Sequence, residues 1–233
     1  MPLYYLDDSN MLFLLIIAFV FSLWAQFAVR HNYSRFSKVH ACGGLTAEQA
    51  AMAILRSGGV EDVTIHPVPG KLTDHYDPKT NTIALSEGVY GQTSLAAIGI
   101  AAHEAGHALQ YAKDYFPIRL RGVVLPLARI GTYAAFPLIL LGLFWNTSAS
   151  QLFINIGIIA YAAVVLFYLI TLPVEYNASN RAMQMLTEQV IVTQEEIPGV
   201  RKVLRAAGLT YVAAAASATL QLLRLLLISR RRN

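Results

Sequence analysis

The chain has 233 residues, of which 55% are hydrophobic and 14% charged, and its formal net charge at pH 7 is +4. Soluble domains carry about 25% charged residues, so this mixture excludes an ordinary cytosolic domain and a disordered chain. The single cysteine, Cys42, cannot form an internal disulfide, which also excludes a small secreted fold held together by disulfides. Long apolar runs in so weakly charged a chain indicate an integral membrane protein.

Residues 11–29 form the first apolar run, and they contain no charged side chain. At about 1.5 Å per residue, a helix of this length crosses a hydrocarbon core of about 30 Å. A cleaved signal peptide is the alternative, but the preceding segment is acidic at Asp7 and Asp8 and no A-x-A site follows. We therefore predict that residues 1–29 comprise an N-terminal segment and a first transmembrane helix.

Two further apolar runs, at residues 131–145 and 152–172, predict a transmembrane hairpin that covers residues 123–173. The earlier run needs residues from about Val123 onward to reach full length. This places Arg129 near one interface, where its long side chain can extend to the headgroups. The polar connection at residues 146–151 is short, and we predict that it is a turn.

Lysine and arginine residues collect on the cytoplasmic side of short loops that flank membrane helices, and here each apolar run carries them on one flank. They follow the first run, precede the second and follow the third: Arg30, Arg35 and Lys38; Lys113, Arg119 and Arg121; and Arg181. The N-terminus and residues 146–151 are then outside the cell. Residues 30–122, a cytoplasmic insertion, and residues 174–233 face the cytoplasm.

The apolar stretch at residues 209–228 has two interpretations. As a fourth span it would carry the arginines at 230–232 outward, against the charge rule, and would place Arg224 deep in lipid. The polar residues of this stretch also share one helical face: Thr210, Ser217, Gln221 and Arg224. We therefore expect a membrane-associated helix, interfacial or packed on the domain, and three transmembrane helices in total.

The cytoplasmic insertion mixes helix and strand signals. Thr46 precedes an alanine-rich amphipathic segment that stops at Gly58 and Gly59, which predicts a capped helix. Short β-like pieces follow at residues 63–68 and 81–86, with a turn at residues 77–80 between them. The second piece is either an exposed edge strand that holds a substrate backbone or part of the sheet core. A long helix then opens at Thr93 or Ser94.

That long helix contains His103, Glu104 and His107 in the pattern H-E-x-x-H. The composition of the chain gives about 0.005 chance occurrences of this pattern, so accident is a weak explanation. Histidines at i and i+4 project from one helical face and can bring two imidazole nitrogens to one Zn²⁺ ion. Glu104 would lie beside the metal, where a carboxylate can take a proton from a water molecule.

Two histidines that merely line a helix, without a metal, are the alternative interpretation. The neighbours of the motif argue against it, because they are small and keep the helix slim enough for a metal, a substrate and a second helix to approach. These neighbours are Ala101, Ala102, Ala105, Gly106 and Ala108.

A catalytic zinc usually has three protein ligands, so a third ligand is needed. The extended H-E-x-x-H-x-x-G-x-x-H pattern fails, because Gln110 and Lys113 stand at its last two positions. Asp114 lies about two turns, or about 10 Å, beyond His107 on the same helix. Glu175 follows the third apolar run, at the start of a helical stretch, and the hairpin returns it to the membrane face of the motif. Glu188 is the second choice.

Four segments together resemble the YugP-like zinc metallopeptidases of bacterial membranes, and more distantly the HtpX group of gluzincins. They are DHYDPKTNTIALSEGVY (residues 74–90), AAHEAGHALQ (residues 101–110), LPVEYNASNRA (residues 172–182) and LTYVAAAASATLQLLRLLL (residues 209–227). The resemblance implies an integral membrane peptidase of the bacterial cell membrane, with zinc on His103, His107 and Glu175 and with Glu104 as the catalytic carboxylate. HtpX-like enzymes have E-x-x-A-D at the third ligand. Here Ser179 replaces that final acid, so a hydroxyl would make its outer contact with a ligand.

We therefore predict an α+β integral membrane protein, mostly helical, with three transmembrane helices and a small zincin-like cytoplasmic domain that holds a short β-sheet. Residues 30–122 would carry the motif helix, and residues 174–233 the third-ligand helix and the membrane-associated C-terminal helix. His75, Tyr76 and Arg181 are candidates for contacts with the substrate or with the developing oxyanion.

The predicted activity is hydrolysis of peptide bonds at the cytoplasmic membrane face, with Zn²⁺ as cofactor and peptides or membrane proteins as substrates. The lipid bilayer is the other expected partner, and no nucleic acid is expected. A non-catalytic membrane scaffold or adaptor stabilised by zinc is the alternative. Glu104 discriminates between the two, because a structural zinc site has no use for that carboxylate.

Overall fold

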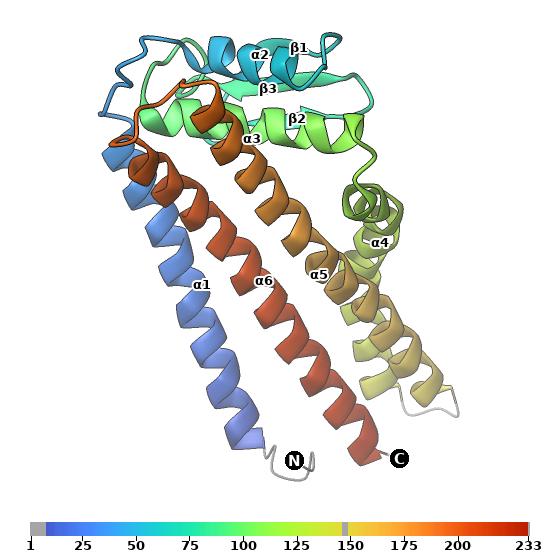
Figure 1. Ribbon diagram of the computed structural model, residues 1–233. Helices are drawn as coiled ribbons and strands as arrows, with labels where there is room; N and C mark the ends of the chain where they lie inside the picture. The colour runs from blue at the N-terminus through green and yellow to red at the C-terminus, as the bar shows by residue number, and fades with distance from the viewer. Residues whose placement is uncertain (1–7, 146–148, 233) are drawn as a thin grey trace. The chain divides into compact units, whose positions relative to one another are not determined.

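The computed structural model describes residues 8–145 and 149–232. The chain divides into two compact units. The helical unit contains Met1–Trp24, Pro117–Leu172 and Thr210–Asn233, and the mixed unit contains Ala25–Phe116 and Pro173–Leu209. Long helices pass from one unit into the other along the chain (Figure 1), so each unit is assembled from segments that lie far apart in the sequence.

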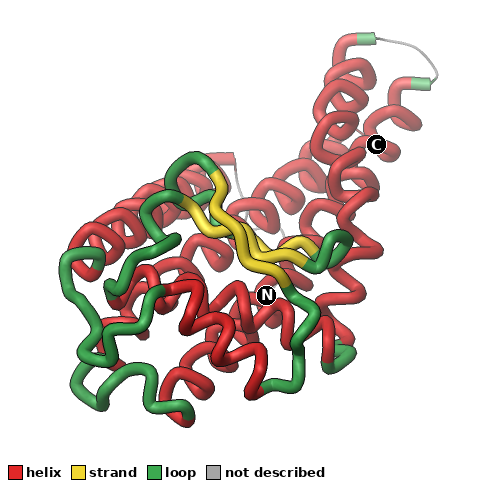
Figure 2. Tube along the Cα trace, turned by 90° about the horizontal axis from the view of Figure 1, so that it is seen from above, coloured by secondary structure: helices red, strands yellow, loops and turns green. Residues whose placement is uncertain are grey.

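The mixed unit holds all of the strands found in the described residues. Its elements are α2 (Ala47–Ser57), β1 (Thr64–Val68), β2 (His75–Asp77), β3 (Thr82–Ser86) and α3 (Leu95–Ala112). The strands form one small sheet in the order β1-β3-β2 (Figure 2), with β1 parallel and β2 antiparallel to β3. Because β3 is the central strand, the suggestion that residues 81–86 are an exposed edge is wrong, and this strand belongs to the sheet core.

Local signals explain where the helices of this unit begin. The Thr46 N–H donates to the Gln49 side chain at 3.0 Å in a capping box at the start of α2. Ser94 is the N-cap of α3, and its Oγ accepts from the Ala97 N–H. The predicted helix starts and the turn at residues 77–80 are therefore confirmed. The short strand β2 was not expected from the sequence.

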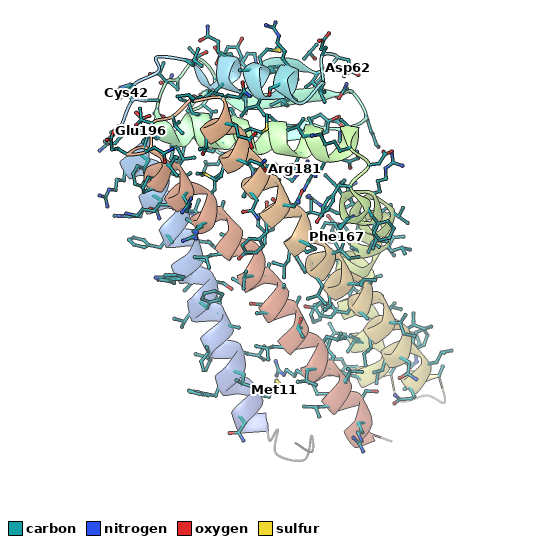
Figure 3. All side chains as sticks on the ribbon, in the orientation of Figure 1. Met11, Cys42, Asp62, Phe167, Arg181 and Glu196 are labelled. Carbon is teal, nitrogen blue, oxygen red and sulfur yellow. The ribbon has the colours of Figure 1, made fainter. Side chains whose placement is uncertain are left out.

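The core of the mixed unit lies around α3. Ile54 and Leu55 of α2, Leu85 of β3, and Ile98 and Leu109 of α3 are essentially fully buried in one cluster. A water-facing domain gains its stability from such burial, at roughly 25 cal/mol per Å² of apolar surface. The loop before α2 is tied to this unit by a carboxylate, since the Cys42 N–H donates to Glu196 Oε1 at 2.7 Å (both labelled in Figure 3).

In the described residues, four helices are long and apolar enough to cross a membrane, judged by length and composition: α1 (Asp8–Phe36), α4 (Phe116–Phe144), α5 (Ser150–Glu188) and α6 (Ile197–Arg232). The described residues therefore hold four candidate spans where the sequence predicts three. The charge rule excluded residues 209–228 because of their arginines. In the structure these residues belong to one continuous helix, in which Arg224 is the one charged residue between Arg205 and Arg230.

Within the helical unit, polar contacts place α6 beside other long helices. Ser22 Oγ of α1 lies 3.3 Å from Ser217 Oγ, and Gln151 Nε2 of α5 donates to Ser229 Oγ at 2.9 Å. Ser217 and Ser229 thus find partners inside the unit, as polar groups of membrane helices do. The end of α6 lies beside the start of α5, which contradicts an interfacial C-terminal helix.

Glycines bring α4 and α5 close together in the helical unit. A Cβ atom at Gly142 would lie 2.5 Å from the Ser150 carbonyl oxygen, and one at Gly157 would lie 2.8 Å from the Ala135 carbonyl oxygen. Small residues allow such backbone approach between membrane helices. The hairpin connection predicted as a turn at residues 146–151 falls partly on residues 146–148, which lie outside the described residues. The helix α5 also continues through Pro173, so Glu175 does not begin a separate helix.

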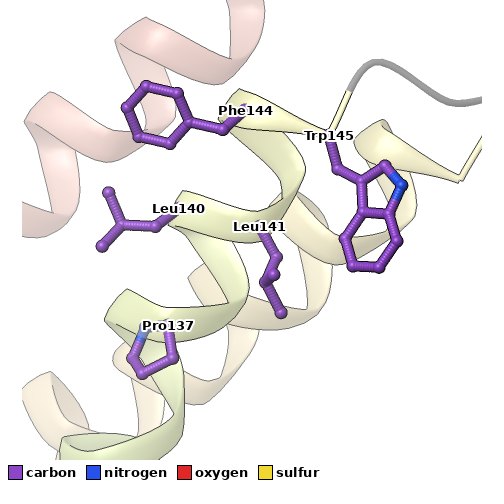
Figure 4. Close-up of a pocket in the computed structure, with 5 residues that line it drawn as sticks. All are labelled: Pro137, Leu140, Leu141, Phe144 and Trp145. Atoms are coloured by element: carbon purple, nitrogen blue, oxygen red, sulfur yellow. The ribbon is translucent and has the colours of Figure 1, made fainter.

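The end of α4 presents a pocket lined by aliphatic and aromatic side chains. Figure 4 shows that pocket, which Pro137, Leu140, Leu141, Phe144 and Trp145 line. Phe144 is 84% exposed, which would be unfavourable in water but is favourable against hydrocarbon. The surface of the helical unit is thus built for a lipid environment.

Candidate metal centre

His103, His107 and Glu175 bring their side chains together within the mixed unit. The two histidines lie on α3 and the glutamate on α5. Glu175 Oε2 is 3.2 Å from His103 Nε2 and 3.6 Å from His107 Nε2, and one ligand atom from each residue lies within 4.8 Å of the others. No other group of this kind with metal-binding side chains is found in the described part of the chain.

The helix carrying the motif approaches α5 closely because its residues are small. A Cβ atom at Gly106 would lie 2.6 Å from the Ala178 carbonyl oxygen of α5. Contacts under about 3 Å are not tolerated by real Cβ atoms, so only glycine fits here without a shift of the backbone. The slimness of this helix, predicted from the sequence, therefore allows the second helix to deliver Glu175.

Each histidine has a polar partner on its other ring nitrogen. His103 Nδ1 lies 3.1 Å from Ser179 Oγ, and His107 Nδ1 lies 3.0 Å from Gln110 Oε1. Metal-binding histidines generally have such partners, which fix the orientation of the ring. The Nε2 atom of each imidazole is thereby directed toward the shared site with Glu175.

The electrostatics of the site centre on His107. Burial by itself lowers the pKa of this imidazole, but the hydrogen bond with Glu175 and the charge of Glu104 outweigh burial and raise the pKa above its ordinary value. A metal cation at the Nε2 atoms would meet the same negative charges that favour the proton. The site therefore has the charge needed for a divalent cation.

Glu104 lies on α3, one residue beyond His103, and is buried with 8% of its surface exposed. Among the described residues its carboxylate acts on His107 through its charge, and no hydrogen bond of this carboxylate is found there. Because Glu104 is also outside the metal-binding group, its oxygens stay free to accept a proton.

The other sequence candidates take different positions. Tyr76 O–H donates to Asn81 Oδ1 at 2.6 Å, and burial raises the pKa of this phenol. His75 Nδ1 lies 2.8 Å from the Thr73 carbonyl oxygen on the edge strand β2 and is exposed. Arg181 Nε donates to Asn177 Oδ1 at 2.7 Å, and its guanidinium lies 5.9 Å from the centroid of the Tyr115 ring. None of these side chains contacts His103, His107 or Glu175 through an interaction found in the described residues.

The structure also separates the two carboxylates considered for the third ligand position. Glu175 is 3% exposed and lies between the histidines, whereas Glu188 is exposed and accepts a hydrogen bond from Gln184 at 2.8 Å on the same helix face. Asp114 lies just beyond the end of α3 and is not part of the metal-binding group.

Sequence reasoning missed Gln110 and Asn177. In the sequence Gln110 only breaks an extended zinc motif, yet its side chain is fully buried and contacts both His107 and α5. Its position three residues after His107 puts it on the same helical face, a signal that is visible in the sequence. Asn177, two residues after Glu175, accepts from Gln110 and carries no comparable signal.

Two imidazole nitrogens and one carboxylate oxygen form a ligand set that suits zinc, with room in the coordination sphere for a water molecule or substrate. The residues present therefore fit a zinc ion, and the arrangement is a candidate metal centre on a helix pair.

Comparisons with known proteins agree with this class. Residues 11–230 match the family described as "putative neutral zinc metallopeptidase", and the chain belongs to that family. The chain is also 45% identical over 217 residues to the "putative membrane protease YugP" of Bacillus subtilis (strain 168), which covers 93% of this chain and 95% of that protein. No solved structure matches the chain. The family resemblance inferred from the sequence segments is confirmed.

Proposed function

We propose that the protein is a membrane-embedded zinc metallopeptidase that hydrolyses peptide bonds at the cytoplasmic face of the bacterial cell membrane. The observation that carries the proposal is the convergence of His103, His107 and Glu175 from two helices, with the free carboxylate of Glu104 on the same helix as the histidines. Membership of the zinc metallopeptidase family supports it.

In this proposal His103, His107 and Glu175 hold the metal. When bound, zinc polarises the scissile carbonyl and lowers the pKa of a water molecule toward about 7. Glu104 takes the proton from that water and passes it to the leaving amine. Ser179 and Gln110 hold the imidazoles in place from behind. Burial of Glu175 and His107 keeps bulk water from competing for the ligands.

The cytoplasmic placement rests on charge. The flanks of the long helices that adjoin the mixed unit are rich in lysine and arginine, whereas the opposite ends carry only the arginines at 230–232. Substrates would then be membrane proteins or unfolded segments next to the membrane, since a site fixed to the bilayer favours chains already held there. The bilayer itself is the second partner.

The experiment that tests the proposal compares wild type with Glu104→Gln. This substitution keeps size and hydrogen bonding but removes the proton acceptor, so zinc content should stay the same while peptide cleavage falls by several orders of magnitude. Cleavage is read by profiling new N-termini in membranes that contain either protein. Unchanged cleavage in Glu104→Gln would contradict the mechanism, and no cleavage by wild type would favour the scaffold interpretation.

The membrane arrangement has its own test. With α6 counted as a fourth span, the chain begins and ends outside, and the mixed unit is inside. In a Cys42→Ser background, Arg230→Cys, at an exposed position in the last turn of α6, should react with an impermeant thiol reagent from outside, while Ser57→Cys should react only after the membrane is opened. Protection of position 230 would mean that α6 does not cross, and external labelling at position 57 would reverse the orientation.

A further inference from the structure

The fully buried side chain of Gln110 links a proposed metal ligand to the backbone of a neighbouring helix. Its Oε1 lies 3.0 Å from His107 Nδ1, and its Nε2 donates to the Val174 carbonyl oxygen at 2.8 Å. The same Nε2 donates to Asn177 Oδ1 at 3.0 Å. All of the hydrogen-bonding atoms of this amide are therefore engaged.

The partners of Gln110 determine which way its amide faces. A backbone carbonyl only accepts hydrogen bonds, so the NH₂ group must face Val174, and Oε1 must face His107. An amide oxygen only accepts, so His107 Nδ1 must be the donor. The neutral imidazole then has no proton on Nε2, and Nε2 is the atom that points to Glu175.

Arg181 fixes the orientation of the Asn177 amide, because its Nε can act only as a donor. Arg181 Nε can only donate, and it donates to Asn177 Oδ1 at 2.7 Å, which identifies that atom as the oxygen of the amide. The same oxygen receives the NH₂ group of Gln110. The Arg181 guanidinium is itself held over the Tyr115 ring. Arg181 and Gln110 therefore both donate to Asn177 Oδ1. Neither the Gln110 amide nor the Asn177 amide can flip without losing these hydrogen bonds.

The partners of His103 and His107 differ in whether they fix the position of the imidazole proton. Ser179 Oγ, next to His103 Nδ1, belongs to a hydroxyl group that can donate or accept by rotating. Gln110 can only accept from His107 because both of its N–H groups are committed. The proton position on His107 is therefore dictated by the protein, while that on His103 is not.

From this difference we infer that Gln110 is a positioning residue that selects the metal-binding tautomer of His107, and that Asn177 and Arg181 hold Gln110 in the required orientation. The inference deepens the proposed function and rests on it, since it takes His107 as a zinc ligand. It also assigns Arg181 to support of the metal centre and not to the oxyanion. Partners of this kind typically change metal affinity about 10- to 100-fold when they are lost.

The test measures zinc affinity by competition with a chelator, together with the denaturation midpoint of the metal-free protein. Gln110→Met fills the same space but removes the acceptor, so zinc affinity should fall about 10- to 100-fold. Gln184→Met is the matched control, because Gln184 is exposed on α5 and contacts only Glu188 among the hydrogen-bonded residues described. Its zinc affinity should equal that of wild type.

A second pair of variants keeps the test decisive if Gln110→Met does not fold. Asn177 acts only as an acceptor in the network, so Asn177→Asp should retain wild-type zinc affinity, whereas Asn177→Leu should lower it by several-fold. A purely structural role would lower the metal-free denaturation midpoint in Gln110→Met and Asn177→Leu without changing zinc affinity. That result would overturn the inference.

Failure of the proposed function gives a different result. If wild type holds no zinc, or if Glu104→Gln cleaves peptides as well as wild type does, the proposed metallopeptidase function is wrong. If wild type binds zinc and loses cleavage in Glu104→Gln, but the variants at 110 and 177 bind zinc as tightly as wild type, only the positioning role is wrong.

Discussion

The two compact units place apolar residues in opposite ways. In the helical unit, large side chains such as Tyr133 and Phe144 are 81% and 84% exposed. In the mixed unit, Ile54 and Leu85 are fully buried. The first arrangement suits hydrocarbon and the second suits water. The long helices thus present an apolar surface suited to a membrane, while the candidate metal centre lies in the unit that has a conventional core.

Both units use glycine for close helix approach, but with different consequences. Gly131 of α4 faces the backbone of α5 at Ala160 in the helical unit, and Gly106 of α3 faces the backbone of α5 at Ala178 in the mixed unit. The former contact holds two apolar helices together. The latter sets the separation between His107 and Glu175, so it should affect metal binding as well as stability.

The largest expected effect comes from removal of the metal. Treatment with a strong zinc chelator should reduce peptide cleavage to background, and added zinc should restore it. The mixed unit should also lose stability, by about 4 kcal/mol if zinc was present at 1,000 times its Kd, whereas the helical unit should not respond. Cleavage assays and thermal unfolding followed by probes in each unit would measure this. Full activity after complete removal of zinc would contradict the account.

Gly106→Ala should give the next largest effect. The added methyl group would meet the Ala178 carbonyl oxygen, so the free energy of unfolding should fall by about 1–3 kcal/mol and zinc affinity should fall with it. Gly122→Ala is the control, because a Cβ atom at Gly122 meets nothing within 4 Å. Chemical denaturation and chelator competition would be measured for both. Equal zinc affinity in the two variants would show that the spacing between α3 and α5 does not affect metal binding.

Gly131→Ala places the same added methyl group in the helical unit. Its Cβ atom would collide with the Ala160 carbonyl oxygen of α5, so the free energy of unfolding should again fall by about 1–3 kcal/mol. Zinc affinity should stay at the wild-type value, since the ligands belong to the other unit. A loss of zinc affinity as large as that of Gly106→Ala would show that the two units do not act separately.

Tyr76→Phe should have the smallest effect. The phenol donates to Asn81 Oδ1, so its removal should cost about 0.5–1.5 kcal/mol of stability and leave kcat nearly unchanged. A donor to the developing oxyanion would instead cost about 100- to 1,000-fold in kcat. Steady-state kinetics of this variant distinguish the two roles. A loss in kcat of about 100- to 1,000-fold would identify Tyr76 as a donor to the oxyanion.

The parts of the fold that depend on local signals were predictable. Apolar length predicted α1, α4 and α5, and capping residues predicted the starts of α2 and α3. The sequence does not predict α6 as a span, because its arginines count as charges that would have to cross lipid. Polar partners within the helical unit, such as Gln151 for Ser229, come from distant segments and are not visible in the sequence. The strand β2 could not be predicted, since it has 3 residues and depends on β3 for its pairing.

In the candidate site, too, local features were predictable and contacts between distant segments were not. The spacing of His103 and His107 is a local property of one helix, and Glu175 was selected because the hairpin returns the chain to the same face. The network behind His107 joins Gln110 to Val174 and Asn177, and no periodicity in the sequence relates residues on two helices in this way. Such contacts become visible only when the helices are packed.

We propose that His103, His107 and Glu175 hold one catalytic zinc ion, and metal analysis of purified protein tests this ligand set. Wild type and Glu188→Ala should contain about one zinc per chain, whereas Glu175→Ala should lose it, because Glu175 is buried between the histidines and Glu188 is exposed on the surface. Full zinc in Glu175→Ala together with loss of zinc in Glu188→Ala would contradict the account.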